Sequence, residues 1–351
     1  MSDHRFTPRR TFLKAAAGTS LAAVGRLAFA QSFLPKEKRF EWLPTECADE
    51  RYPMELVSGG LYGSDGLIAA LPSGKTVNNG WGQIGSRHLI GAPHKPVPNS
   101  LKLSWFSYAE DQFFAGTVAL PHAELTQLFE RGFVGPLMGT RETWTKIIVG
   151  MGLGGWTSVW LAGGELVREV ARAQLQAAQL NWALVLDNPA IERSAFIRSK
   201  LQSRLGKAEL DLLARHGPPV GTWTRYAQRH RRRVVVAGVH MPLHMFLRSF
   251  NGERQFHDLA QPVPEALEAV PKHLQITWLT NNGRKQLSEI HLDESEVFGA
   301  LDQAGVAASN TPPMILRVEL GARSRVSMVL ECQATRIPLT RARVEVSSLG
   351  N

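Results

Sequence analysis

The feature that most constrains the fold of this 351-residue chain is a pattern that occurs twice. Residues 101–106, LKLSWF, alternate apolar and polar side chains and carry a tryptophan, and residues 274–279, LQITWL, do the same. This period of two residues is typical of a strand that is buried on one face. In both places a second strand and then a short helical pattern follow, at residues 120–129 and 292–301. The repeated order of elements predicts two similar units.

Two further pairs of segments extend this repeat. An aliphatic strand follows each helical pattern, at residues 145–150 and 314–318, and upstream residues 52–57 correspond to residues 241–246. An ancient internal duplication is the preferred interpretation. Identity between the two halves is low, so a chance similarity of two segments with mixed helices and strands is the alternative.

The predicted fold class is α+β. Each unit is expected to be a twisted, mostly antiparallel sheet with one packed helix. Pro121 suits the first turn of the first helix, and Asp293 can cap the second. We place a first unit at residues 31–165, a helical connector at residues 166–228 and a second unit at residues 229–351.

The connector contains two segments with helical composition. Residues 165–176 are rich in Glu, Ala, Arg and Leu, and are expected to form a helix. A second helix is expected over residues 192–216, with Pro189 before it and Gly217-Pro218-Pro219 ending it.

The first 30 residues read as a twin-arginine export signal. A basic segment precedes a weakly apolar stretch that is too short to cross a membrane, and small residues follow before Gln31. The alternative is an amphipathic N-terminal helix of a cytosolic protein. The residues that carry the prediction are Arg9, Arg10, Phe12 and Leu13 in the export motif and Ala28 and Ala30 at the cleavage site.

This signal predicts a soluble periplasmic protein that meets the twin-arginine translocase during export. No cysteine directly follows the apolar stretch, and Cys47 lies too far downstream for lipid attachment. Cys47 and Cys332 are the only cysteines, and they could form one disulfide bond or remain two buried thiols.

The charge and hydropathy of the chain exclude some classes of function. The signal holds five of the 40 Lys and Arg residues and one of the 31 Asp and Glu residues, so the remainder is near +5. This mild excess, without a basic stripe that includes aromatic residues, argues against nucleic-acid binding. After the signal, the sequence has no apolar stretch long enough to predict a transmembrane helix.

An ordered series of short motifs resembles the domain-of-unknown-function family 2931 of proteobacterial envelope proteins. The resemblance is clear over residues 40–174 and weaker at Trp223, Tyr226 and Arg229, and Arg232 stands where the family is expected to have an aromatic residue. Many relatives look like lipoproteins, which this chain does not. The motifs are Arg51-Tyr52-Pro53, Asp65-Gly66, Asn79-Gly80-Trp81-Gly82, residues 103–114, Leu120-Pro121, Ile148-Val149-Gly150, Gly154-Gly155 and Val159-Trp160-Leu161.

This resemblance implies no reaction. Some members of that family are encoded beside type VI secretion components and phospholipase effectors, which implies an immunity or accessory protein whose partner is a secreted effector.

The glycine-rich segment at residues 150–155 is expected to be a turn between two strands and not a phosphate-binding loop. The β-branched and aromatic residues that follow it read as a strand, whereas a dinucleotide site requires a helix there. Pro242 disfavours the helix on which His240 and His244 would bind a metal as an i, i+4 pair. The sequence therefore predicts no metal site and no cofactor.

Four residues are the best candidates for contact with a ligand. Trp81 lies in a glycine-rich loop, where an exposed indole would be unfavourable unless it packs or binds. Tyr108 precedes Glu110 and Asp111, which resemble a catalytic carboxylate pair, although a hairpin with a charged tip in solvent is the simpler interpretation. The run at residues 229–233, RHRRR, fits either contact with an acidic partner or anionic lipid headgroups, or a solvated edge strand or linker, and the second interpretation is preferred.

No catalytic residue is predicted, and the sequence disfavours an enzyme. The preferred function is a non-enzymatic binding protein or an immunity or accessory factor linked to type VI secretion lipase effectors. The alternatives are an envelope enzyme or small-ligand binder with a site between the two units, and a structural envelope factor.

Overall fold

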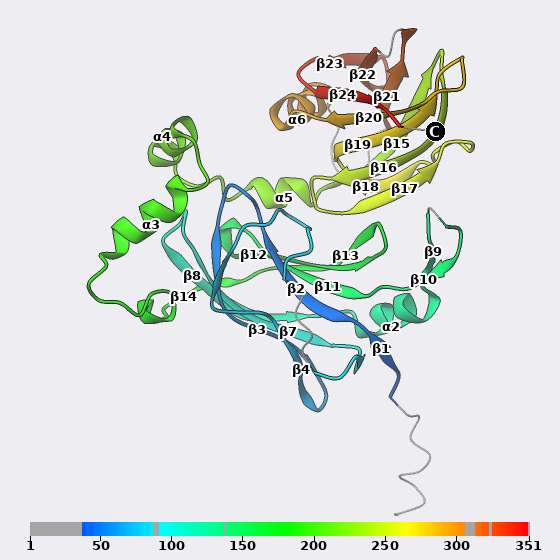
Figure 1. Cartoon of the computed structure of the whole chain (residues 1–351). Helices are drawn as coiled ribbons and strands as arrows, with labels where there is room; N and C mark the ends of the chain where they lie inside the picture. Colours follow the sequence, from blue (N-terminus) through cyan, green and yellow to red (C-terminus); the bar gives the residue numbers. More distant parts are fainter. Residues whose placement is uncertain (1–36, 87–90, 137, 306–312, 323–324, 350–351) are drawn as a thin grey trace, which may run out of the picture. The chain divides into compact units, whose positions relative to one another are not determined.

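A computed structural model describes residues 37–86, 91–136, 138–305, 313–322 and 325–349 (Figure 1). The predicted export and cleavage residues lie outside these ranges. Residues 39–351 form one compact unit. Within it, the first half (residues 39–178) and the second half (residues 229–348) each contain strands of two large sheets and one α-helix, and the first half has two further two-stranded sheets. The described part is mostly β, with five α-helices, and is compatible with the predicted α+β class.

One sheet belongs to the first half alone, with the strand order β14-β8-β7-β3-β4 and β5 paired to β3. Its central strand β7 contains the alternating segment with Trp105, and this side chain is fully buried. The strands are β3 (Met54–Gly63), β4 (Gly66–Ala70), β5 (Lys75–Val77), β7 (Ser100–Ser107), β8 (Gln112–Ala119) and β14 (Gln176–Ala178).

A nine-stranded sheet contains strands of both halves, in the order β2-β11-β12-β13-β17-β16-β19-β20-β24. The two parts of this sheet meet between β13 and β17, which share one registered residue pair, Val167 with Arg254. The strands are β2 (Leu43–Ala48), β11 (Lys146–Met151), β12 (Trp156–Gly163), β13 (Leu166–Gln174), β17 (Arg254–Asp258), β16 (Met241–Ser249), β19 (Pro271–Leu279), β20 (Lys285–His291) and β24 (Arg343–Ser348).

The second half adds a five-stranded sheet with the order β18-β15-β21-β22-β23. Its strands are β18 (Ala266–Ala269), β15 (Arg229–Gly238), β21 (Met314–Leu320), β22 (Val326–Cys332) and β23 (Thr335–Leu339). The strand orders of the two halves correspond to each other. The order β14-β8-β7-β3-β4 matches β24-β20-β19-β16-β17, and the order β2-β11-β12-β13 matches β15-β21-β22-β23. In both halves the first pair of the latter series, β2 with β11 and β15 with β21, is parallel.

Each half has one helix between corresponding strands. Helix α2 (His122–Arg131) lies between β8 and β11, and α6 (Glu294–Gln303) lies between β20 and β21. The predicted cap of α6 is confirmed, because the carboxylate of Asp293 accepts a hydrogen bond from the backbone N–H of Glu296 at 2.8 Å. Pro121 occupies the N-cap position of α2.

Two expectations about local structure are wrong. Residues 165–176 do not form a helix, because β13 pairs with β12 along its whole length and buries Val167. That pairing overrides the helical preference of its Glu, Ala and Arg residues. Each half also contributes strands to two large sheets, whereas one sheet was expected. A second sheet therefore packs against the apolar core of each half in addition to the helix.

The single helix expected over residues 192–216 is present as two separate helices. They are α3 (Arg193–Gln202) and α4 (Lys207–His216), and a shorter helix, α5 (Thr222–Tyr226), follows them. No helix in these ranges has the length and apolar character that crossing a lipid bilayer would require.

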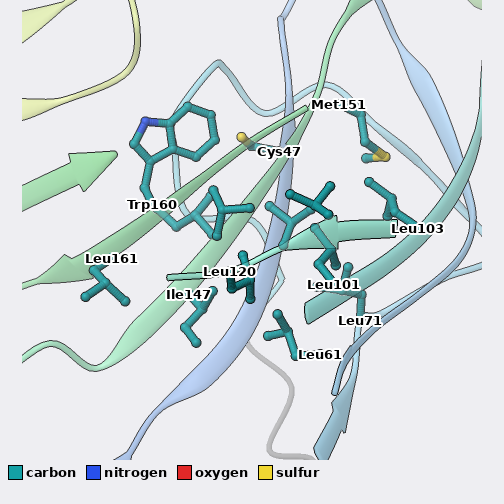
Figure 2. Packing of buried hydrophobic residues seen from close by; sticks show 14 of the residues in the cluster. Cys47, Leu61, Leu71, Leu101, Leu103, Leu120, Ile147, Met151, Trp160 and Leu161 are labelled. Carbon is teal, nitrogen blue, oxygen red and sulfur yellow. The ribbon is translucent and has the colours of Figure 1, made fainter. Parts of the chain in front are cut away.

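Strands of both sheets supply the core of the first half. Figure 2 shows Leu101 and Leu103 of β7 beside Ile147, Met151 and Trp160 of β11 and β12. Cys47 of β2 lies in this core, and Cys332 of β22 is buried in the second half. Both thiols are free, so the two cysteines do not form a disulfide bond.

The two halves approach closely at a pair of glycines. A Cβ atom built on Gly82 would lie 2.6 Å from both the Cα and the carbonyl oxygen of Gly252. Beside them, the indole N–H of Trp160 donates a hydrogen bond to the carbonyl oxygen of Asn251 at 3.1 Å. Both glycines have positive φ, so side chains are disfavoured at this contact for two reasons.

The remaining described elements are short. They are the paired strands β1 (Arg39–Glu41) and β6 (His94–Pro96), the paired strands β9 (Phe133–Val134) and β10 (Arg141–Glu142), and the 3-10 turns η1 (Leu153–Gly155) and η2 (Trp182–Leu184). The turn η1 joins β11 to β12, which confirms the turn expected at the glycine-rich segment.

Candidate functional site

A groove of about 550 Å³ lies where β13 of the first half meets β15, β17 and β18 of the second. We call it the charged groove, because acidic, basic and amide side chains from all four strands converge on it. The polar residues that line it are Arg168, Glu169, Arg229, Glu253, Arg254, Gln255, His257 and Glu268.

Two buried carboxylates share the same partners in this groove. Arg229 lies 2.9 Å from Glu253 Oε1 and 3.6 Å from Glu169 Oε2. The amide of Asn251 donates to Glu253 Oε2 at 3.0 Å and to Glu169 Oε2 at 3.3 Å. The side chains of Glu169 and Glu253 are only 4% and 8% exposed, so each depends on these donors to compensate for lost hydration.

Further contacts hold Glu169 in position. Its Oε1 accepts a hydrogen bond from the hydroxyl of Ser158 at 3.0 Å, and its backbone N–H donates to Glu253 Oε1 at 3.1 Å. Burial raises the pKa of Glu169; Arg172 opposes this rise and Glu253 adds to it. Burial also disfavours the charged form of Arg229, but its hydrogen bond to Glu253 keeps the pKa of Arg229 above its ordinary value.

A second ion pair joins the buried Arg232 to Glu268, which lines the groove. Arg232 is 1% exposed, and it lies 2.8 Å from Glu268 Oε2 and donates from Nε to the carbonyl oxygen of Ala269 at 2.8 Å. Gln255 donates to the other oxygen of Glu268 at 2.8 Å. Arg232 Nη1 and His257 Nε2 are buried and have no hydrogen-bond partner among the described residues.

These contacts correct the interpretation of the arginine run. Strand β15 is not an edge strand, because it lies between β18 and β21. Arg229, Arg231 and Arg232 form ion pairs with acidic residues of this chain. Most of the run therefore stabilises the second half and its junction with β13, and does not form a free basic surface.

The rim of the groove is apolar in part. Val134 of β9 is 69% exposed and Leu267 of β18 is 50% exposed, and both line the groove. A charged floor with an apolar rim can bind a ligand through hydrogen bonds and exclude water around it.

The four residues predicted to contact a ligand do not line this groove. Trp81 is 6% exposed and packs edge-on against Trp160 and Trp223, with ring centroids 5.1 and 5.6 Å away. Core packing therefore accounts for the tryptophan in this glycine-rich loop. Tyr108 is 1% exposed, and its hydroxyl donates to Glu55 Oε2 at 2.9 Å.

The structure separates the two acids of the turn after β7. Asp111 is exposed and accepts from Arg193 Nε at 2.9 Å, as a charged tip would. Glu110 is not in open solvent: it is half-buried and accepts a hydrogen bond from the backbone N–H of Gly154 at 2.7 Å. Burial raises the pKa of Glu110. These acids thus have different surroundings and do not face each other as a catalytic pair.

One group among the described residues has the side chains of a metal site. The ligand atoms of His273, Glu289 and His291 all lie within 4.8 Å of one another. Burial and the neighbouring His291 lower the pKa of His273 to about 4. Neither strand shows a metal-binding spacing by itself, so sequence inspection missed this group.

The comparisons with known proteins show the family of the chain. The sequence profile described as "Protein of unknown function (DUF2931)" matches residues 30–221, which is more than half of the 351 residues. No curated protein and no solved structure shows significant similarity to the chain. The matched region includes the first half and α3 and α4, and it agrees with the resemblance seen in the motifs. The chain therefore belongs to the DUF2931 family of proteins of unknown function.

Proposed function

We propose that this chain is an exported binding protein of the cell envelope whose ligand site is the charged groove. One observation carries the proposal: buried carboxylates and a guanidinium from both halves converge on one cavity of about 550 Å³. Cavities with a few convergent polar groups and perturbed pKa values are typical of ligand sites. The motif at Arg9 and Arg10 supports export by the twin-arginine route to the periplasm.

The groups in the groove favour a small polar ligand. Glu169 and Glu253 are acceptors for hydroxyl or amino groups, and Arg229 and Arg254 are donors for hydroxyl or carboxylate groups. Acceptors and donors lie side by side, so the groove suits a molecule that carries both kinds of group, such as an amino acid, an amino sugar or a hexose. The half-buried ring of Phe256 gives such a molecule one apolar surface.

A ligand screen with matched variants tests this proposal. Protein without the signal peptide is titrated calorimetrically with amino acids, amino sugars and hexoses. We expect one class to bind, and Arg254→Ala, which removes a half-buried donor of the groove that is paired with Glu165, to weaken binding at least about tenfold. The control is Arg193→Ala, which removes an arginine paired with Asp111 outside the groove. Binding that Arg254→Ala leaves unchanged, or no binding by any of the three classes, contradicts the proposal.

The carboxylates of the same groove also allow an enzymatic function to be tested. Two neighbouring carboxyl groups, here those of Glu169 and Glu253, can serve as general acid and base. Ser158 is 2% exposed and donates to Glu169, so its role is to position that carboxylate. A ligand that binds and is then converted, as followed by mass spectrometry, would replace the binding function with an enzymatic one.

The immunity or accessory function linked to type VI secretion lipase effectors is a second candidate. One structural observation favours a protein partner: Val134 and Leu267, two apolar residues that line the groove, have exposed side chains. Co-purification with a lipase effector and protection of a strain exposed to it are the tests. Loss of both in a Val134→Ser, Leu267→Ser variant would support this candidate, whereas no partner and no protection would exclude it.

We also propose that the two halves arose by duplication. The corresponding strand orders and the parallel pairs β2–β11 and β15–β21 support this. The family profile ends at residue 221, so the second half would be a copy that has diverged beyond its reach. The charged groove would then exist only after the duplication, since residues of both copies line it.

A further inference from the structure

A second cluster of polar side chains lies on β19 and β20, apart from the charged groove. His273 and His291 are directly opposite each other in the antiparallel register of these strands. Their rings are stacked, with centroids 4.1 Å apart and an angle of 19° between the planes. Glu289 is two residues before His291 on β20, so it projects from the same face of the sheet.

The three side chains have capacity left for a ligand. His273 Nε2 is buried and has no hydrogen-bond partner among the described residues. Gln275 donates from Nε2 to Glu289 Oε1 at 2.7 Å, which orients the carboxylate and leaves its second oxygen to coordinate. Carboxylates and imidazoles that bind metals are commonly held by an outer hydrogen bond of this kind.

Two imidazoles and one carboxylate are the ligand set of many zinc sites with an open coordination position. Zinc holds such ligands at about 2.0–2.2 Å, so their donor atoms lie roughly 3.5 Å apart in tetrahedral geometry. The donor atoms here lie within 4.8 Å of one another, so binding one ion requires them to move closer and the two stacked rings to turn until both nitrogens face it. Imidazole ligands also suit Cu²⁺ and Ni²⁺, whereas they do not favour Mg²⁺ or Ca²⁺.

We propose that His273, Glu289 and His291 form a binding site for Zn²⁺ or a similar divalent transition metal. The site is independent of the proposed ligand groove, because none of its residues lines that groove. Three protein ligands leave at least one position for water or for a group of a partner molecule.

Neighbouring charges set the strength of this site. Arg248 of β16 is in register with His273, and Arg343 of β24 is in register with His291. Glu345, which is in register with Glu289, lies 3.4 Å from Arg343 Nε and offsets part of this positive charge. Two guanidinium groups still outnumber this one carboxylate, so we expect weaker binding than in a zinc site without neighbouring cations. Arg343 is exposed and its removal leaves the three ligands in place. Arg343→Gln should therefore tighten binding several-fold.

The experiment is a calorimetric titration of the mature chain with Zn²⁺, repeated with Co²⁺ and followed by visible absorption. We expect one equivalent to bind, with Co²⁺ bands of a tetrahedral or five-coordinate site. His291→Ala and Glu289→Gln should each weaken binding at least about tenfold, and Gln275→Ala should do so about tenfold through the lost outer hydrogen bond. His122→Ala, on the exposed face of α2, is the matched control and should bind as the parent does.

Circular dichroism verifies that each variant is folded. His291 and Gln275 are only partly buried, so their variants keep the test valid if His273→Ala does not fold. Absence of a binding heat overturns the proposal, as does binding that His291→Ala, Glu289→Gln and Gln275→Ala all leave unchanged. Tighter binding by Arg343→Gln supports it, and weaker binding by that variant overturns it.

Discussion

The contact between Gly82 and Gly252 permits a sharp test of how the two halves are held together. An alanine at position 82 would place its Cβ 2.6 Å from the Cα and the carbonyl oxygen of Gly252. Both clashing atoms belong to the backbone, so no side chain can rotate away. The two backbones must separate by several tenths of an ångström, and this strains the neighbouring hydrogen bond from Trp160 to Asn251.

The expected destabilisation of Gly82→Ala has two parts. Gly82 has a φ of +71°, and an L-residue in that left-handed region costs about 1–2 kcal/mol. Inserting a methyl group into a filled contact costs about 1–3 kcal/mol more. The sum is about 3 kcal/mol, a large fraction of the stability of an ordinary domain.

Gly74 provides the matched control, because it has the same φ of +71° and would meet nothing within 4 Å of an added Cβ. Gly74→Ala therefore measures the backbone strain alone, about 1–2 kcal/mol. The free energy of unfolding of the parent and of both variants is measured by urea denaturation with circular dichroism. The difference between the two variants is the steric energy of the contact between the halves.

Equal destabilisation by Gly82→Ala and Gly74→Ala would refute this reasoning. It would mean that the backbones at residues 82 and 252 do not approach closely in solution. A separate low-urea transition in Gly82→Ala would instead show that the substitution uncouples one half from the other, and it would confirm that this contact joins them.

Three other predictions follow from buried groups. Glu268→Gln should destabilise the fold by about 3 kcal/mol, since it leaves the guanidinium of Arg232, which is 1% exposed, without an ionised partner. The Arg232→Met, Glu268→Leu double variant should be less destabilised, and if urea titrations showed that its loss of unfolding free energy equals the sum of the two single-variant losses, the two residues would not interact. The pKa of Glu169 is raised in the fold, so the free energy of unfolding should fall as pH rises above about 4.5 and through the raised pKa. Glu169→Gln should lack this pH dependence, and identical pH profiles of the unfolding free energies of the parent and of Glu169→Gln would contradict the raised pKa of Glu169. Burial raises the pKa of Cys47 to about 12, so the native protein should not react with a chromogenic thiol reagent until it is unfolded. A rapid rise in the absorbance of the released product under native conditions would show that the thiol is accessible.

Local patterns were sufficient to predict much of the fold. The alternation around Trp105 and Trp278 identified β7 and β19, which occupy corresponding positions in the two halves, because a period of two residues is visible in the sequence without any distant partner. The cap at Asp293 was equally local, since it bonds a backbone N–H three residues away. Glu169 shows the limit: its segment has helical composition, but pairing with β12 makes it a strand.

The candidate sites depend on contacts that no local pattern records. Asn251 donates to Glu169, 82 residues away, and Arg229 begins β15 whereas its partner Glu253 lies between β16 and β17. His273 and His291 meet only through the register of β19 and β20. The burial of Trp81 could not be predicted for a related reason. Its loop is rich in glycine, as exposed loops often are, but those glycines allow the chain to pack against Trp160 and Trp223.

The single residue pair between β13 and β17 also affects how the protein behaves among other copies of itself. Apart from Val167 and Arg254, the facing edges of these strands have no registered partner in each other. Open strand edges recruit strands of other chains and lead to aggregation. Arg168 and Arg254 lie beside this opening, and charges at such positions keep foreign strands from pairing. Neutral substitutions there should therefore lower solubility before they lower the free energy of unfolding.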